Sequence, residues 1–103
     1  KKTDTTLLSG IKAYFEGNYV KAQKNAGTAL KLTDSPIITA VSAVIAARSA
    51  HELDDTKVRD QYIATALRKA PTEKSLSLMA KADFLLSEGH HQEALGRLGR
   101  ALQ

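Results

Sequence analysis

The sequence predicts an all-α protein made of three helical hairpins (six helices), stacked as a short right-handed α-solenoid. Apolar residues recur with helical spacing along almost the whole chain, and no segment alternates with the two-residue period of a strand. Short breaks containing glycine or aspartate interrupt this pattern at regular intervals. Alanine-leucine pairs close alternate helices, first 37 and then 35 residues apart, a spacing typical of helical-hairpin repeats.

Six helices are predicted near residues 4–16, 19–33, 36–52, 56–70, 73–88 and 91–102. The first carries an apolar stripe with Leu7, Leu8 and Ile11, whereas the third is apolar on almost every face, as expected for a helix between neighbours. Paired in order, the helices form repeats over about 4–34, 35–71 and 72–103 of a single domain.

Each hairpin has a predicted turn. Gly17 and Gly89 stand where a helix stops and the backbone needs a left-handed residue, and Asp54 takes that place in the second hairpin. Asn18 is placed to cap the second helix, and Ser35 is placed to cap the third.

Small residues are expected where paired helices approach each other closely. Ala29 and Ala66 are therefore predicted to lie in helix–helix seams. Arg59 occupies a position that favours a small residue, so we expect it to loosen or tilt the second hairpin.

Composition excludes several classes of site. The chain has no cysteine, which excludes disulfides and cysteine-based metal sites. The net charge of +4 comes from interspersed charges, which favours a solvated mixed surface over a nucleic-acid footprint. The longest apolar stretch, Ile37–Ala47, is too short to span a bilayer. Because the chain starts abruptly at Lys1 and ends within a helical pattern at Gln103, we expect a soluble fragment of a longer protein.

The spacing of small residues resembles the tetratricopeptide repeat, which has a small residue in its first helix, a glycine at the turn and small residues in its second helix. In the first repeat these are Gly10, Gly17, Ala22 and Ala29, with Tyr19 after the turn. The third repeat has Ala82, Gly89, Ala94 and Ala101, and the second is degenerate.

A narrower resemblance is to the soluble part of the HemY proteins. It rests on the run Leu8–Ala22 and on Asp34–Ile38, which leads into the alanine-rich Ala46–Ala50. HemY proteins are bacterial inner-membrane proteins linked to protohaem synthesis, with two N-terminal membrane helices followed by tetratricopeptide-like repeats. The resemblance implies a membrane-anchored parent with this domain on the cytoplasmic face, and a supporting role in late protohaem synthesis through protein partners.

No catalytic or cofactor site is predicted. Serine and threonine are scattered over helix surfaces without a matching histidine, so the chain is not expected to be an enzyme. His90 and His91 are adjacent and point in different directions, and His51 ends the third helix. We interpret these as solvated histidines rather than haem or metal ligands.

The tetratricopeptide resemblance implies that the first helix of each hairpin lines a concave, partner-binding groove. The positions that it assigns to this groove are mostly apolar, which suits an amphipathic helix or an extended segment of a protein partner. They are Leu7, Ile11, Tyr14, Val41, Val44, Arg48, His51, Leu76, Met79, Asp83 and Leu86. The alternative is that many of them pack against an adjacent repeat or subunit, and the exposed end of the solenoid is expected to favour a homodimer.

A second candidate function is binding of single-stranded RNA by an α-solenoid. Such proteins need a basic groove with stacking aromatic residues, whereas this groove has one arginine, one aspartate and one tyrosine. The sequence therefore favours a protein-binding scaffold and no nucleic acid. Within that class, the positions that clamp acidic chaperone tails are Leu7, Ile11, Ile45, Leu76 and Ala80, none of which can donate a hydrogen bond, so we expect no binding of such a tail.

Overall fold

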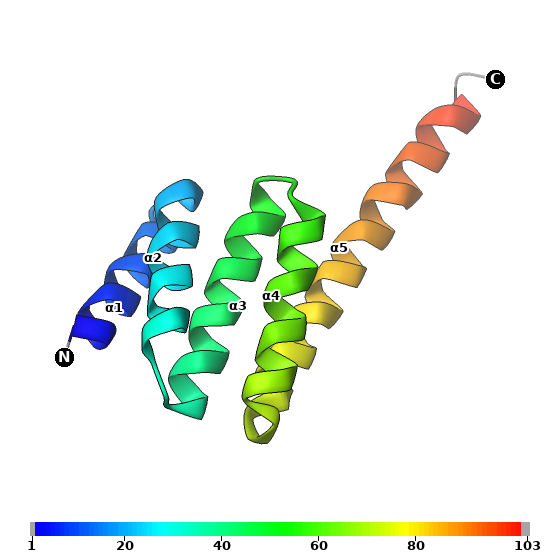
Figure 1. Cartoon of the computed structure of the whole chain (residues 1–103). Helices are drawn as coiled ribbons and strands as arrows, with labels where there is room; N and C mark the ends of the chain where they lie inside the picture. Colours follow the sequence, from blue (N-terminus) through cyan, green and yellow to red (C-terminus); the bar gives the residue numbers. More distant parts are fainter. Residues whose placement is uncertain (1, 102–103) are drawn as a thin grey trace.

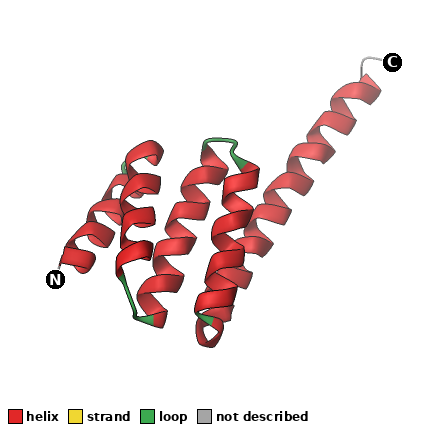
Figure 2. Cartoon of the chain, in the orientation of Figure 1, coloured by secondary structure: helices red, strands yellow, loops and turns green. Residues whose placement is uncertain are grey.

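The computed structural model describes residues 2–101, and within them the chain is helical with no strand (Figure 2). Its elements are α1 (Lys2–Phe15), α2 (Tyr19–Leu32), α3 (Pro36–Glu52), α4 (Thr56–Lys69), the short 3-10 turn η1 (Pro71–Glu73) and α5 (Lys74–Ala101). The first four helices form a row of two antiparallel hairpins (Figure 1). The prediction of an all-α protein is confirmed.

The first hairpin turns at the predicted glycine. Gly17 has a φ of 79°, which costs glycine nothing but would strain any residue with a Cβ. The backbone N–H of Asn18 donates to the carbonyl of Ala13 at 2.9 Å, which satisfies one of the free carbonyls at the end of α1. Its side chain then accepts a hydrogen bond from the N–H of Lys21 at 3.3 Å and caps α2.

The second hairpin repeats this turn with different residues. Asp54 has a φ of 60°, so an aspartate adopts the left-handed conformation that glycine has in the first hairpin. Asp55 donates its N–H to the carbonyl of Ala50 at 2.9 Å and accepts from the N–H of Val58 at 3.2 Å. The turn geometry is therefore shared, which confirms that Asp54 stands in for the glycine.

Buried alanines hold the row of helices together. Ala22, Ala29, Ala43, Ala47 and Ala66 are all fully buried, so the predicted seam positions of Ala29 and Ala66 are confirmed. Gly10 shows how close the approach is, because a Cβ added there would lie 3.1 Å from the backbone nitrogen of Ala26. Larger side chains at these positions would push the helices apart.

Arg59 does not separate the helices of the second hairpin, contrary to our expectation. Helices α3 and α4 stay in contact much as α1 and α2 do. The Arg59 side chain is buried, and its guanidinium is held by Glu88 of α5. The residue therefore links the second hairpin to the next helix.

The prediction of six helices is wrong, because the described residues form five. α5 runs without interruption for 28 residues through Gly89, where a turn was predicted, so the third hairpin (72–103) is not closed. Gly89 lies in ordinary helical backbone, and His90 stands where the other two turns have a capping Asn18 or Asp55. Without a cap, a turn would leave the N–H groups of a new helix unsatisfied, whereas a continuous helix pairs them. Leu102 and Gln103 lie outside the described residues.

The long α5 gives the molecule its shape. Its first half packs beside α3 and α4, and its second half projects beyond the row of helices (Figure 1). The principal extents are consequently 58 × 27 × 18 Å. Within residues 2–101, no helix is both long and apolar enough for a membrane span.

Candidate protein-binding groove

Residues from α1, α3 and α5 come together in a hollow of about 170 Å³. Four of the predicted groove residues line it, namely Tyr14, Arg48, His51 and Asp83. Sequence analysis missed the remaining lining residues, Glu52, Phe84 and Ser87. One helix of each predicted repeat therefore contributes to the hollow.

The other predicted groove residues differ in accessibility. Met79 and Leu86 are 64% and 60% exposed and continue the apolar surface along α5. Val41, Ile11 and Leu76 are half-buried. Two predictions need correction, because Leu7 is only 8% exposed and belongs to the core, and Val44 packs on the core around Ala47 and Ile63. The periodicity identified an apolar face here but could not separate its buried edge from its exposed edge.

An ion pair crosses the groove between α3 and α5. The Arg48 Nη2 lies 2.7 Å from the Asp83 Oδ2, and the two side chains are 30% and 58% exposed. A pair this accessible to water adds little to stability. Its two charges remain available to a polar group of a ligand, and it fixes both side chains at the edge of the hollow.

The contacts of His51 define its tautomer. Its Nδ1 lies 3.0 Å from Nη1 of Arg59, which is always a donor, so Nδ1 must accept. The proton then sits on Nε2, which donates to the Ser87 Oγ at 3.3 Å. The ring also stacks on Phe84 with centroids 4.7 Å apart. His51 thus joins α3 to α5.

These contacts also bear on catalysis. A serine nucleophile needs a histidine that accepts its proton, but here the Nε2 of His51 donates to Ser87. The Nδ1 faces a guanidinium instead of the carboxylate that orients a catalytic histidine. The pair therefore has the hydrogen-bond polarity opposite to that of a catalytic dyad.

Arg59 is the most enclosed charge at the junction of α3, α4 and α5. It is 5% exposed and lies 5.0 Å above the Phe84 ring. Its Nη1 donates to Glu88 at 2.6 Å and its Nε donates to Asp60 at 2.9 Å. Burial lowers the pKa of the guanidinium, but the hydrogen bonds to Asp60 and Glu88 outweigh burial and raise the pKa above its ordinary value. Arg59 therefore stays charged and ties α4 to α5.

Sequence analysis could not have found this junction. Arg59 and Glu88 are 29 residues apart, and Glu88 was predicted only as the end of the fifth helix. No short motif encodes such a pair, because its partners meet only after α5 has packed on the second hairpin.

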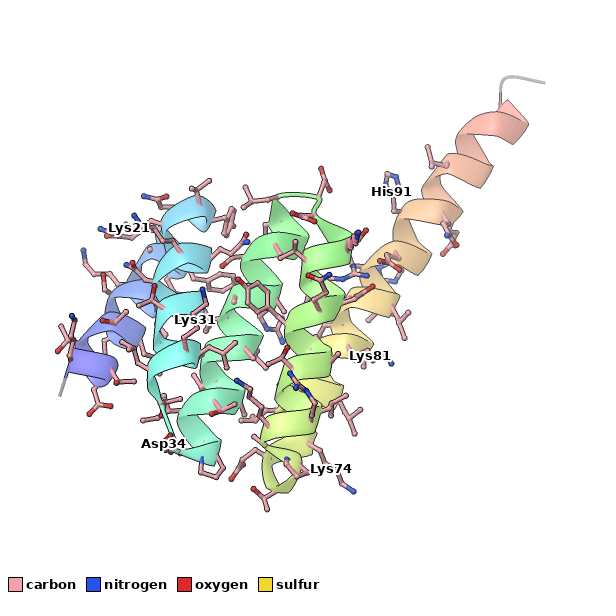
Figure 3. All side chains as sticks on the ribbon, in the orientation of Figure 1. Lys21, Lys31, Asp34, Lys74, Lys81 and His91 are labelled. Atoms are coloured by element: carbon pink, nitrogen blue, oxygen red, sulfur yellow. The ribbon has the colours of Figure 1, made fainter. Side chains whose placement is uncertain are left out.

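The histidines at the predicted third turn lie instead on α5. His90 and His91 are exposed, and His91, labelled on α5 in Figure 3, borders a cleft of about 310 Å³ together with Asp54 and Thr56 of the second hairpin. In the described part of the chain, no three histidine, aspartate or glutamate side chains form a group that could hold a metal ion.

Comparison of the chain with protein-family models, curated proteins and solved structures finds no match.

Proposed function

We propose that this chain is a non-catalytic protein-interaction module that binds an amphipathic helix or an extended segment of a partner along the groove of α1, α3 and α5. The observation that carries the proposal is the hollow to which Tyr14, Arg48 and Asp83 contribute from three different helices. Met79 and Leu86 do not line the hollow, but their spacing of four and three residues from Asp83 places their exposed apolar side chains next to it on α5. Amphipathic helices and extended segments bind to apolar surfaces that also carry a few polar side chains.

The chemistry of the groove limits the partner. Arg48 and Asp83 neutralise each other across the groove and Glu52 adds a negative charge to its lining, so the groove does not attract a strongly acidic ligand. Single-stranded RNA remains the alternative, but it would need positive charge along the groove. An apolar helix with polar groups near the Arg48–Asp83 pair suits this surface better.

The repeat architecture supports a tetratricopeptide-like solenoid as the finer description of the fold. Two successive hairpins share a left-handed turn residue followed by an Asn or Asp cap. With the resemblance of Leu8–Ala22 to HemY proteins, this supports a place in a bacterial inner-membrane parent, with the module on the cytoplasmic face and a role in late protohaem synthesis through partners. An affinity pull-down from native membranes with the full-length parent tests that assignment.

Selection of displayed peptides tests the binding proposal directly. A library of amphipathic helical and extended peptides is selected on the chain, and dissociation constants of the winners are measured by calorimetry. We expect amphipathic, weakly charged peptides whose affinity falls at least about tenfold in Met79→Glu, since a carboxylate would be desolvated in the groove. Leu85→Glu is the matched control, because Leu85 is similarly exposed at 60% but borders the cleft with α4 on another side of α5.

Three results would contradict the proposal. Equal loss of affinity in the Met79 and Leu85 variants would place the peptide elsewhere on α5. If the selection yields no binding peptide, the groove is not a peptide-binding site. Salt-dependent binding of a uridine oligonucleotide, weakened by Arg48→Ala, would favour the RNA alternative.

A further inference from the structure

One face of the long helix α5 is exposed, although Leu85 borders a cleft shared with α4 and Gln92 borders one shared with α3 and the second turn. Its N-terminal half presents Leu78, Ala82 and Leu85, all exposed, with the two leucines at 47% and 60%. The same face continues through Gly89 to Gln92, Gly96 and Gly99, also exposed, at alternating spacings of four and three residues. This spacing places the seven residues, here named the α5 stripe, along one side of the helix.

In the first hairpin, the corresponding place is occupied by a helix. Gly10 precedes its turn glycine by seven residues, as Ala82 precedes Gly89, and the backbone of α2 lies 3.1 Å from where a Gly10 Cβ would be. Within residues 2–101, no helix takes that place beside Ala82. Instead, a cleft of about 380 Å³ opens between α4 and α5, lined by Ala64, Leu67 and Leu85 among others. The row of second helices, α2 and α4, thus ends at a cleft that adjoins the α5 stripe and has both apolar lining residues and charged ones such as Lys81 and Glu88.

The glycines of the α5 stripe indicate what could pack beside α5. Gly10 and Gly27 each have a neighbour that limits side-chain size, but a Cβ at Gly89 or Gly99 would meet nothing within 4 Å. Glycine inside a helix lowers stability relative to alanine, so these residues weaken α5 without any packing reason within one chain. Glycine at these positions would be explained if the backbone of another helix packed against α5 there, because small residues allow two helices to approach closely.

We propose that the α5 helices of two copies of this chain pack antiparallel along the α5 stripe, with Gly89 of each copy at the twofold axis. In this register Leu78 lies opposite Gly99 of the second copy and Ala82 lies opposite Gly96 of the second copy. The bulky half of each stripe meets the small half of the other, so the surface is self-complementary, as a twofold interface requires. The second copy also places its α5 next to the α4–α5 cleft, continuing the row of α2 and α4.

The length of α5 makes the pairing feasible. Its 28 residues span about 42 Å, roughly twice the length of the 14-residue α4. Its projecting half can therefore reach a second molecule without displacing any helix of its own. The stripe is separate from the groove that includes Met79, so this inference goes beyond the proposed function and can fail independently of it.

Light scattering of the full chain over a dilution series tests the pairing. We expect a mass of two chains of 11.1 kDa each, falling to one chain in Leu85→Glu. Leu8→Glu is the control, because Leu8 is 65% exposed on α1 and its variant should remain dimeric. Monomer at every concentration, or dissociation by both variants alike, would overturn the proposal.

Engineered cysteines test the register, since the chain has none of its own. Gly89→Cys should form a disulfide-linked dimer with itself on oxidation. When the Ala82→Cys and Gly96→Cys variants are mixed and refolded together, a short thiol cross-linker should join them as mixed dimers. Neither variant should cross-link efficiently on its own, because the two copies of one cysteine lie about 21 Å apart along the helix pair. An internal cross-link in the double variant Ala82→Cys/Gly96→Cys, as a monomer, would instead show that 91–101 folds back, and would overturn the pairing.

Discussion

The first hairpin and helix α5 have the same arrangement of small residues but different structures. Both have a small residue seven positions before a glycine, and alanines five and twelve positions after it. Around Gly17 the chain turns back and α2 packs on α1, whereas around Gly89 it continues as one helix. A turn glycine therefore permits a hairpin but does not impose one.

Two differences between these regions account for the outcome. Asn18 follows Gly17 and caps α2, whereas His90 follows Gly89 and leaves no capping side chain of the usual type. In addition, α2 contacts both α1 and α3, so its small residues are buried on two sides. In residues 2–101, by contrast, α5 contacts α3, α4 and η1, and no element packs on its other side.

The largest contrast is expected from filling the two equivalent small positions with leucine. Gly10→Leu should lower the free energy of unfolding by about 3 kcal/mol, because the new side chain would meet the α2 backbone. Ala82→Leu should change it by less than about 0.5 kcal/mol in the monomer, because Ala82 is exposed. Urea denaturation at low protein concentration measures both. Equal losses would show that a helix does pack on Ala82.

Alanine at the two turn glycines should have effects of opposite sign. Gly17→Ala should cost about 1–2 kcal/mol, because its φ of 79° strains a residue with a Cβ. Gly89→Ala should stabilise α5 by about 0.5–1 kcal/mol, because the position is helical. Thermal unfolding followed by circular dichroism separates the two. Destabilisation by both variants would mean that Gly89 also adopts a left-handed turn.

The caps give a smaller and more local contrast. Asn18→Ala and Asp55→Ala should each lose about 1 kcal/mol, since each removes an acceptor for an N–H in the first turn of a helix. His90→Asn should change stability by less than about 0.3 kcal/mol, because histidine and asparagine have similar helix propensities. A clear gain in His90→Asn would indicate that the third hairpin needs only a cap in order to close.

The smallest effect is expected where α5 meets the second hairpin. Ser77 is 1% exposed and its Oγ has no hydrogen-bond partner. Ser77→Ala should therefore be neutral or stabilising by up to about 1 kcal/mol, because it removes an unsatisfied buried hydroxyl. A loss of stability measured by urea denaturation would reveal a polar contact of Ser77.

Local features of the sequence predicted most of the fold. Turn chemistry at Gly17 and Asn18, the Ser35 cap and the alanine seams specify α1 to α4, because each depends on residues close in sequence or on a repeated spacing. The third hairpin was predicted from the same spacing and is absent, because spacing carries no information on the missing cap or the missing neighbour. The recurring small residues around Gly89 are present in the sequence, but the turn that they predict is not formed.

The groove was predictable only in part. Tyr14, Arg48, His51 and Asp83 meet as the aligned turns suggested, since equivalent positions of stacked hairpins come together. The buried position of Leu7 and the link between Arg59 and Glu88 depend on the exact packing between elements. Neither follows from periodicity, which gives the direction of a side chain but not the depth to which it is covered.

The distance between two spin labels on α5 tests the central claim, that this helix is continuous through Gly89. Labels at Met79→Cys and Gly99→Cys, in chains diluted with excess unlabelled protein so that only distances within one molecule are seen, are measured by double electron–electron resonance. A continuous helix predicts a separation of about 30 Å along its axis. A dominant distance near 10 Å, the spacing of two packed antiparallel helices, would show a closed third hairpin and contradict the account.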